Sequence, residues 1–106
     1  MTMPNITDEI ASQVLQTDQP VVFFFTAEWC GRCKILGPTL EQLSDEFSGR
    51  AVIYQVNVDN CPQTAMKYGV RSPPEVIFIK NSKVVDKHVG SVPKTVLQEK
   101  LSAQLS

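Results

Sequence analysis

The sequence lacks the features that mark secreted, membrane-bound or nucleic-acid-binding proteins. It has only three cysteines, an odd number, which is too few for the disulfide framework of a small secreted protein. Its longest apolar run, residues 21–25, falls far short of the roughly 20 residues of a membrane span. Charge of one sign is never concentrated, and ten Lys and Arg against eleven Asp and Glu give a formal net charge of −1. We therefore expect no nucleic-acid partner and no membrane contact.

The composition that is present is ordinary for a globular protein, with 42% hydrophobic and 20% charged residues. This excludes a disordered tail, and the length allows a single domain, 1–106, whose core needs no disulfide. The first residues show no basic stretch followed by an apolar one, so we expect no signal peptide and a cytoplasmic protein. In a reducing compartment, a pair of cysteines is more often catalytic or metal-binding than structural.

Hydrophobic periodicity predicts a helix near the N-terminus. Ile6, Ile10 and Val14 recur every four residues, as on one face of an amphipathic helix. Thr7 or Asp8 would cap this helix, because their side-chain oxygens can accept hydrogen bonds from the first free backbone N–H groups.

The rest of the chain alternates strand and helix patterns. Residues 21–25 are apolar at every position, which is typical of a strand buried on both faces. A leucine stripe predicts a helix over 36–47, interrupted by Pro38 and ended by Gly49. Further strands are expected at 52–58, 76–79 and 84–89, and further helices at 62–68 and from residue 93 onward. The pattern predicts an α/β fold, a central mixed β-sheet flanked by helices, because βαβ units need parallel strands and the closing hairpin antiparallel ones.

The residues that carry chemistry form the segment Trp29-Cys30-Gly31-Arg32-Cys33-Lys34, between the buried strand and the second helix. Cys30 would lie at a helix N-terminus, where free N–H groups and the helix dipole stabilise a thiolate. Cys33 follows one helical turn later, within reach of a disulfide. An attacking thiolate and a second thiol at this spacing can exchange disulfides.

Along nearly its whole length the chain resembles the thioredoxin family. The matching stretches keep their order and spacing: 27–31, 33–34, 57–59, 67–71, Pro74 and Gly90. The resemblance implies the thioredoxin fold and thiol–disulfide exchange on proteins, with Cys30 as the nucleophile and Cys33 as the resolving thiol. Pro74 would be a cis-proline facing them.

The resemblance also implies the surroundings of the pair. Trp29, Gly31, Arg32 and Lys34 would support the active site. We expect no metal and no organic cofactor. The expected partners are disulfide-containing protein substrates and a thioredoxin-reductase-like or other thiol donor, and we expect a monomer.

Two departures from the family pattern concern redox chemistry. Arg32 stands where the family usually has proline, and its charge should favour the reduced, ionised pair and a more oxidising disulfide. Phe24 and Gln55 align with the family's buried aspartate and its lysine partner. The group that moves protons at Cys33 is thus absent, and we expect slower resolution of the mixed disulfide. Solvent or another group, such as nearby Glu28, must take that proton.

Other departures concern substrate binding, which we assign to Pro73, Pro74, Glu75 and Gly90. Pro73 has no N–H to offer an extended substrate. Glu75 would add a carboxylate beside the loop, so we expect basic or neutral substrates to be preferred. Thr26 replaces a tryptophan that is common in the family.

Alternative readings remain for the cysteines. The fold could be a binding or regulatory module with impaired redox chemistry, or a more oxidising exchange or isomerase protein. A zinc site would need two close pairs of ligands, whereas Cys61 and His88 are isolated in the sequence. Cys61 at a helix entrance could be a mildly reactive thiol or an ordinary loop residue.

Overall fold

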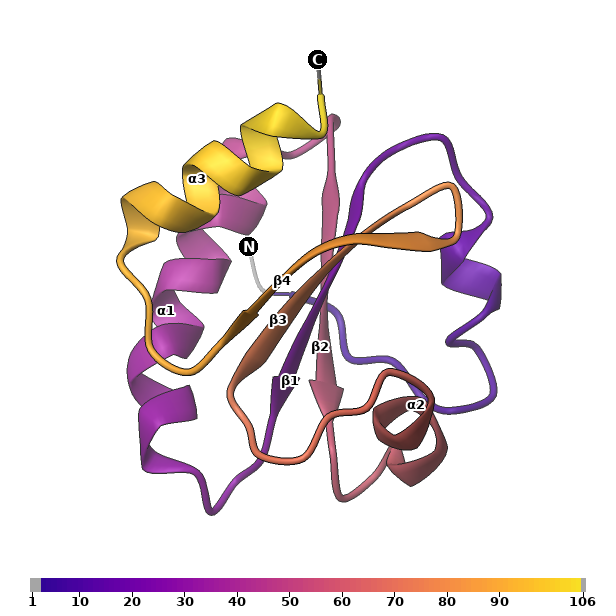
Figure 1. Ribbon diagram of the computed structural model, residues 1–106, viewed down its shortest axis with the longest axis vertical. Helices are drawn as coiled ribbons and strands as arrows, with labels where there is room; N and C mark the ends of the chain where they lie inside the picture. Colours follow the sequence, from indigo (N-terminus) through magenta and orange to yellow (C-terminus); the bar gives the residue numbers. More distant parts are fainter. Residues whose placement is uncertain (1–2, 106) are drawn as a thin grey trace.

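A computed structural model describes residues 3–105, in which a four-stranded sheet separates two layers (Figure 1). In chain order the elements are the 3-10 helix η1 (Gln13–Leu15), β1 (Val21–Thr26), α1 (Gly31–Glu46), β2 (Val52–Asn57), α2 (Pro62–Lys67), β3 (Glu75–Lys80), β4 (Lys83–Val89) and α3 (Lys94–Ala103). The strand order is β2-β1-β3-β4. β1 pairs in parallel with β2, and the β1–β3 and β3–β4 pairs are antiparallel. The predicted mixed sheet is confirmed.

β1 lies at the centre of the core, as its continuous apolar run predicts. All six of its residues are buried, and their side chains alternate between the two faces of the sheet. Val22 and Phe24 join the core cluster that includes the buried leucines of α1 and α3, whereas Phe23 and Phe25 join the cluster that includes Ala65 of α2. Figure 1 shows α1 and α3 on one side of the sheet and α2 with the N-terminal segment on the other.

The helix and hairpin boundaries follow the turn residues. α1 contains Pro38, and Gly49 follows it with a φ of +84°, a conformation that glycine adopts without strain. Pro62 begins α2, as predicted. Asn81 and Ser82, with φ of 55° and 65°, make the tight turn that joins β3 to β4.

The predicted N-terminal α-helix is wrong. Turns occupy residues 8–12, and only η1 is helical. The backbone before the turns is used elsewhere, because Asn5 bridges Gln55 and the N–H of Ile6 donates to the Gln55 carbonyl at 3.2 Å. The start of the predicted helix is thus held against the outer edge of β2.

Asp8 caps a different helix from the one expected. Its carboxylate accepts hydrogen bonds from the backbone N–H groups of Gln63 (3.2 Å) and Thr64 (2.9 Å) at the start of α2. The Thr64 hydroxyl donates to it as well, at 2.6 Å. These bonds, led by that of the hydroxyl, lower the pKa of Asp8 and tie the N-terminal segment to α2.

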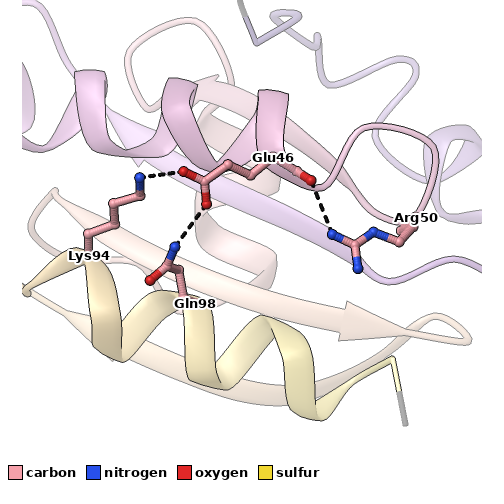
Figure 2. A network of polar contacts seen from close by, with 4 residues as sticks. All are labelled: Glu46, Arg50, Lys94 and Gln98. Carbon is pink, nitrogen blue, oxygen red and sulfur yellow. Dashed lines mark hydrogen bonds and ion pairs between the residues drawn. The ribbon is translucent and has the colours of Figure 1, made fainter.

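Polar contacts connect α3 to α1 (Figure 2). The Glu46 carboxylate, near the end of α1, pairs with the ammonium of Lys94 and accepts a 2.8 Å hydrogen bond from the Gln98 amide. The Glu46 carbonyl accepts from Arg50 at 3.1 Å. These contacts reinforce the packing of the helices on one face of the sheet. Among residues 3–105, no helix combines the length and apolarity that crossing a bilayer requires.

Candidate active site

Cys30 and Cys33 form a disulfide at the start of α1. Cys30 is the N-cap residue with an extended backbone, and the N–H of Cys33 donates to its Sγ at 3.1 Å. Both are buried, Cys33 more so, at 2% exposure against 6%. The first turn holds no acidic residue that would oppose a negative charge there. The sulfur of Cys30 therefore lies where the helix N-terminus stabilises a thiolate.

A proline loop faces the sulfur of Cys30. The peptide bond between Pro73 and Pro74 is cis, and both residues are buried. The Pro73 carbonyl oxygen lies 3.6 Å from the Sγ of Cys30. Gly90, with a φ of +87°, donates its N–H to the Pro74 carbonyl at 2.9 Å. The structure thus brings Pro73, Pro74 and Gly90 together beside Cys30.

Glu75 departs from the expected arrangement. We expected its carboxylate to face substrates, but the residue is only 3% exposed. One carboxylate oxygen accepts from the N–H of Arg71 at 3.3 Å, and the other lies 3.4 Å from the Lys87 ammonium. Alternation along β3 puts Glu75 on the same face as Ile77. Glu75 therefore anchors the proline loop to β4 from inside the protein, and the expectation of a substrate-facing carboxylate is wrong.

Trp29 is 66% exposed, so its side chain lies at the surface beside the motif and not in the core. Its indole N–H donates to the Asp59 carboxylate at 2.8 Å. The Asn57 side chain shapes the loop that carries Asp59, accepting from the backbone N–H groups of Asp59 (2.9 Å) and Asn60 (3.2 Å). No local sequence pattern predicts the contact between Trp29 and Asp59. Gly31 and Arg32 are exposed on the first turn of α1.

A cavity of about 320 Å³ lies beside Cys33. Phe24 and Gln55 both line it, and they are register partners in the β1–β2 ladder. The two positions that align with the family's buried charge pair therefore adjoin each other and Cys33. Charged residues also line this cavity, namely Glu28, Lys34 and Glu41. The sequence does not single out Glu41, because only the folded structure shows that Glu41 and Cys33 line the same cavity.

Cys61 is a buried free thiol, with its Sγ 3.2 Å from the Ile6 carbonyl oxygen as a hydrogen-bond donor. Burial raises its pKa, and the nearby charges of Asp8 and Glu9 raise it further. This environment argues against the reactive thiol considered above. Nε2 of His88 lies 3.3 Å from the Ser91 carbonyl oxygen. Within residues 3–105, no group of three or more His, Cys, Asp or Glu residues is placed to hold a metal ion.

Comparisons with known proteins agree with this geometry. The profile of the family described as Thioredoxin matches residues 2–103. Thioredoxin of Chlorobaculum thiosulfatiphilum is 43% identical over 94 residues, which cover 89% of this chain and 87% of that protein. Thioredoxin 2 of Chlorobaculum tepidum is 42% identical over 94 residues, 89% of this chain and 86% of that one. The chloroplastic thioredoxin M4 of Arabidopsis thaliana is 40% identical over 98 residues, 92% of this chain and 51% of that protein.

Proposed function

This chain belongs to the thioredoxin family and is a thiol–disulfide oxidoreductase, and we propose that it reduces protein disulfides with Cys30 as nucleophile and Cys33 as resolving thiol. The observation that carries the assignment of roles is the 3.1 Å hydrogen bond from the N–H of Cys33 to the Sγ of Cys30. It stabilises negative charge on Cys30 in particular, because Cys30 is the N-cap residue of α1.

The reaction proceeds in two exchanges. The Cys30 thiolate attacks a substrate disulfide, forms a mixed disulfide with one substrate sulfur and displaces the other as a thiolate. Cys33, once deprotonated, then attacks the Sγ of Cys30. The Cys30–Cys33 bond forms, the bond from Cys30 to the substrate breaks, and the second substrate sulfur leaves. Two electrons pass from the dithiol to the substrate.

Substrate contacts at the proline loop are limited by its chemistry. Pro73 has no N–H, so it offers an extended substrate only its carbonyl oxygen, which faces Cys30 at 3.6 Å. The buried Glu75 holds the loop in place and adds no charge at its surface. We therefore propose that substrates bind here through fewer backbone hydrogen bonds than a loop with an N–H at this position would give.

The completed cycle requires a source of electrons. We propose that a thioredoxin-reductase-like enzyme or another thiol donor reduces the Cys30–Cys33 disulfide, that the protein acts as a monomer, and that it acts in the cytoplasm. Among the relatives, the M-type thioredoxins of plants are chloroplastic by name.

Trapping of the mixed disulfide tests the assignment of roles. Cys33→Ser should accumulate a stable, dithiothreitol-sensitive adduct with a disulfide-bonded protein such as insulin, because Cys30 attacks and nothing resolves the product. Cys30→Ser is the matched control and should form no such adduct. Equal adduct formation by the two variants would overturn the roles. Retention of the same clients by the Cys30→Ser, Cys33→Ser double variant would favour a binding module.

A further inference from the structure

The cavity beside Cys33 connects the resolving thiol to water. Its volume of about 320 Å³ has room for several water molecules, at roughly 30 Å³ each. Phe24 of β1 contributes an apolar side chain with no titratable group to the cavity wall. Its register partner on β2, Gln55, contributes an amide. Water in such a cavity can hydrogen-bond to polar walls and to the thiol of Cys33.

The charged residues that line this cavity come from α1 and from the loop that precedes it. Glu28 comes from the loop after β1, and Lys34 and Glu41 come from α1. The strands and the N-terminal segment contribute uncharged residues: Met3, Phe24, Thr26, Gln55 and Asn57. Two carboxylates therefore face the same space as Cys33.

The geometry of α1 distinguishes the two carboxylates. Cys33, Gly37 and Glu41 are spaced four residues apart, so they follow one stripe of the helix over about 12 Å of rise. Helical side chains lean toward the N-terminus, which directs Glu41 back toward Cys33. Gly37, between them, has no side chain, and apart from its chain neighbours and the backbone of α1 itself no atom lies within 4 Å of where its Cβ would be. The stripe thus leaves an open path from Glu41 to Cys33.

We propose that Glu41 accepts the proton of Cys33 through water in this cavity when the mixed disulfide is resolved. The S–H bond of Cys33 breaks, its proton passes along the water to the Glu41 carboxylate, and its electron pair forms the bond to the Sγ of Cys30. The bond between Cys30 and the substrate breaks, and the substrate leaves as a thiolate. Glu41 then releases the proton to solvent. Glu41 does not touch the reacting sulfur atoms and acts on Cys33 only through water.

Glu28 is the weaker choice on the same evidence. It is exposed, and it also lines a second cavity, whose wall includes Asn5 and Thr7 of the N-terminal segment. Glu41 is half-buried and is carried by the same helix as Cys33. A group on a rigid helix holds its distance to the thiol better than a group on a loop.

The inference rests on the proposed function, and a single-turnover reaction with 5,5′-dithiobis(2-nitrobenzoate) tests both. In a Cys61→Ser background, attack by Cys30 releases one thionitrobenzoate and resolution by Cys33 releases a second. Glu41→Gln should slow the second release about 100-fold at pH 7, the lower end of general-base catalysis, and leave the first unchanged. The difference should close as the pH passes the ordinary thiol pKa of about 8.5, because Cys33 then ionises unaided. Glu99→Gln, an exposed change on α3, is the matched control.

A second variant tests the path without removing the carboxylate. Gly37→Leu should fill the space between Glu41 and Cys33 and slow the second release to a similar degree. Combined with Glu41→Gln it should add little, because both changes interrupt one proton path. Thermal unfolding of each variant verifies that it is folded.

Each other outcome has a distinct meaning. An unchanged second release in Glu41→Gln, a larger loss in Glu28→Gln, or a loss that persists at high pH would each overturn the role of Glu41. A protein with unaltered Cys30 and Cys33 that releases only one thionitrobenzoate would instead overturn the proposed two-cysteine cycle.

Discussion

Replacing Phe24 by aspartate would return a carboxylate to the position where the thioredoxin family buries one. Phe24 is 2% exposed and packs in the cluster between the sheet and α1. Truncating a buried aromatic of this kind costs about 3–5 kcal/mol. A buried carboxylate with no charged partner adds about 3–5 kcal/mol more. Because small domains are stable by about 5–15 kcal/mol, we expect Phe24→Asp alone to lie near the limit of folding.

Gln55→Lys should rescue part of this loss, because Phe24 and Gln55 are register partners that line one cavity. In a double-mutant cycle, the two changes together should be more stable than the sum of the single effects by about 1–3 kcal/mol. Urea unfolding of the four proteins, followed by circular dichroism, measures this coupling. A coupling within about 0.5 kcal/mol of zero would refute the conclusion that the side chains at these two positions meet in one cavity.

The same variants carry a pH test and a kinetic test. Burial without a partner raises the pKa of the new carboxyl in the folded state, so folded Phe24→Asp binds more protons than the unfolded chain. Its stability should therefore fall as the pH rises from about 4 through that raised pKa. In the folded double variant, resolution of the mixed disulfide at pH 7 should be faster than in the unaltered protein. An unchanged rate would count against the view that proton removal from Cys33 limits this step.

Three further predictions concern other parts of the molecule. Asp8→Asn should lower the melting temperature at pH 7 but have little effect at pH 2. The lowered pKa of Asp8 gives stability above about pH 4, and this stability is lost as the pH falls through the folded-state pKa. Equal losses of melting temperature at both pH values would contradict this. Arg32→Pro should make the redox midpoint more negative by tens of millivolts, where about 30 mV corresponds to about 1.4 kcal/mol. Equilibration with glutathione measures this midpoint, and a shift to a less negative value would contradict the prediction. Cys61 should resist iodoacetamide in the native reduced protein while Cys30 reacts, because Cys61 is buried with a raised pKa; mass spectrometry showing early Cys61 alkylation would disprove this.

The parts of the fold that local patterns predict are those where packing and turn chemistry agree. The run 21–25 is apolar throughout and becomes the central strand, and Pro62 begins α2. The N-terminal periodicity misled because tertiary contacts overrode it. The backbone of Ile6 pairs with Gln55 and the carboxylate of Asp8 caps α2, so neither serves a helix of its own segment.

The active site was predictable where one segment carries it and less so where distant segments meet. Cys30 and Cys33 follow from one motif at a helix start. The bond from Trp29 to Asp59 joins residues 30 positions apart and leaves no local pattern. Glu75 is a different case, since strand alternation with Ile77 and Ile79 already points it inward. The polarity of its side chain suggested exposure, but Arg71 and Lys87 provide its partners.

The redox equilibrium of the Cys30–Cys33 pair in glutathione buffers tests the central claim most directly. Trp29, the only tryptophan, precedes Cys30, so its fluorescence can report the disulfide, and thiol counting after acid quenching provides an independent readout. We predict one reversible two-electron transition, with a midpoint less negative than the roughly −270 mV typical of a thioredoxin. A protein that forms no disulfide at any ratio of oxidised to reduced glutathione would contradict the proposed cycle.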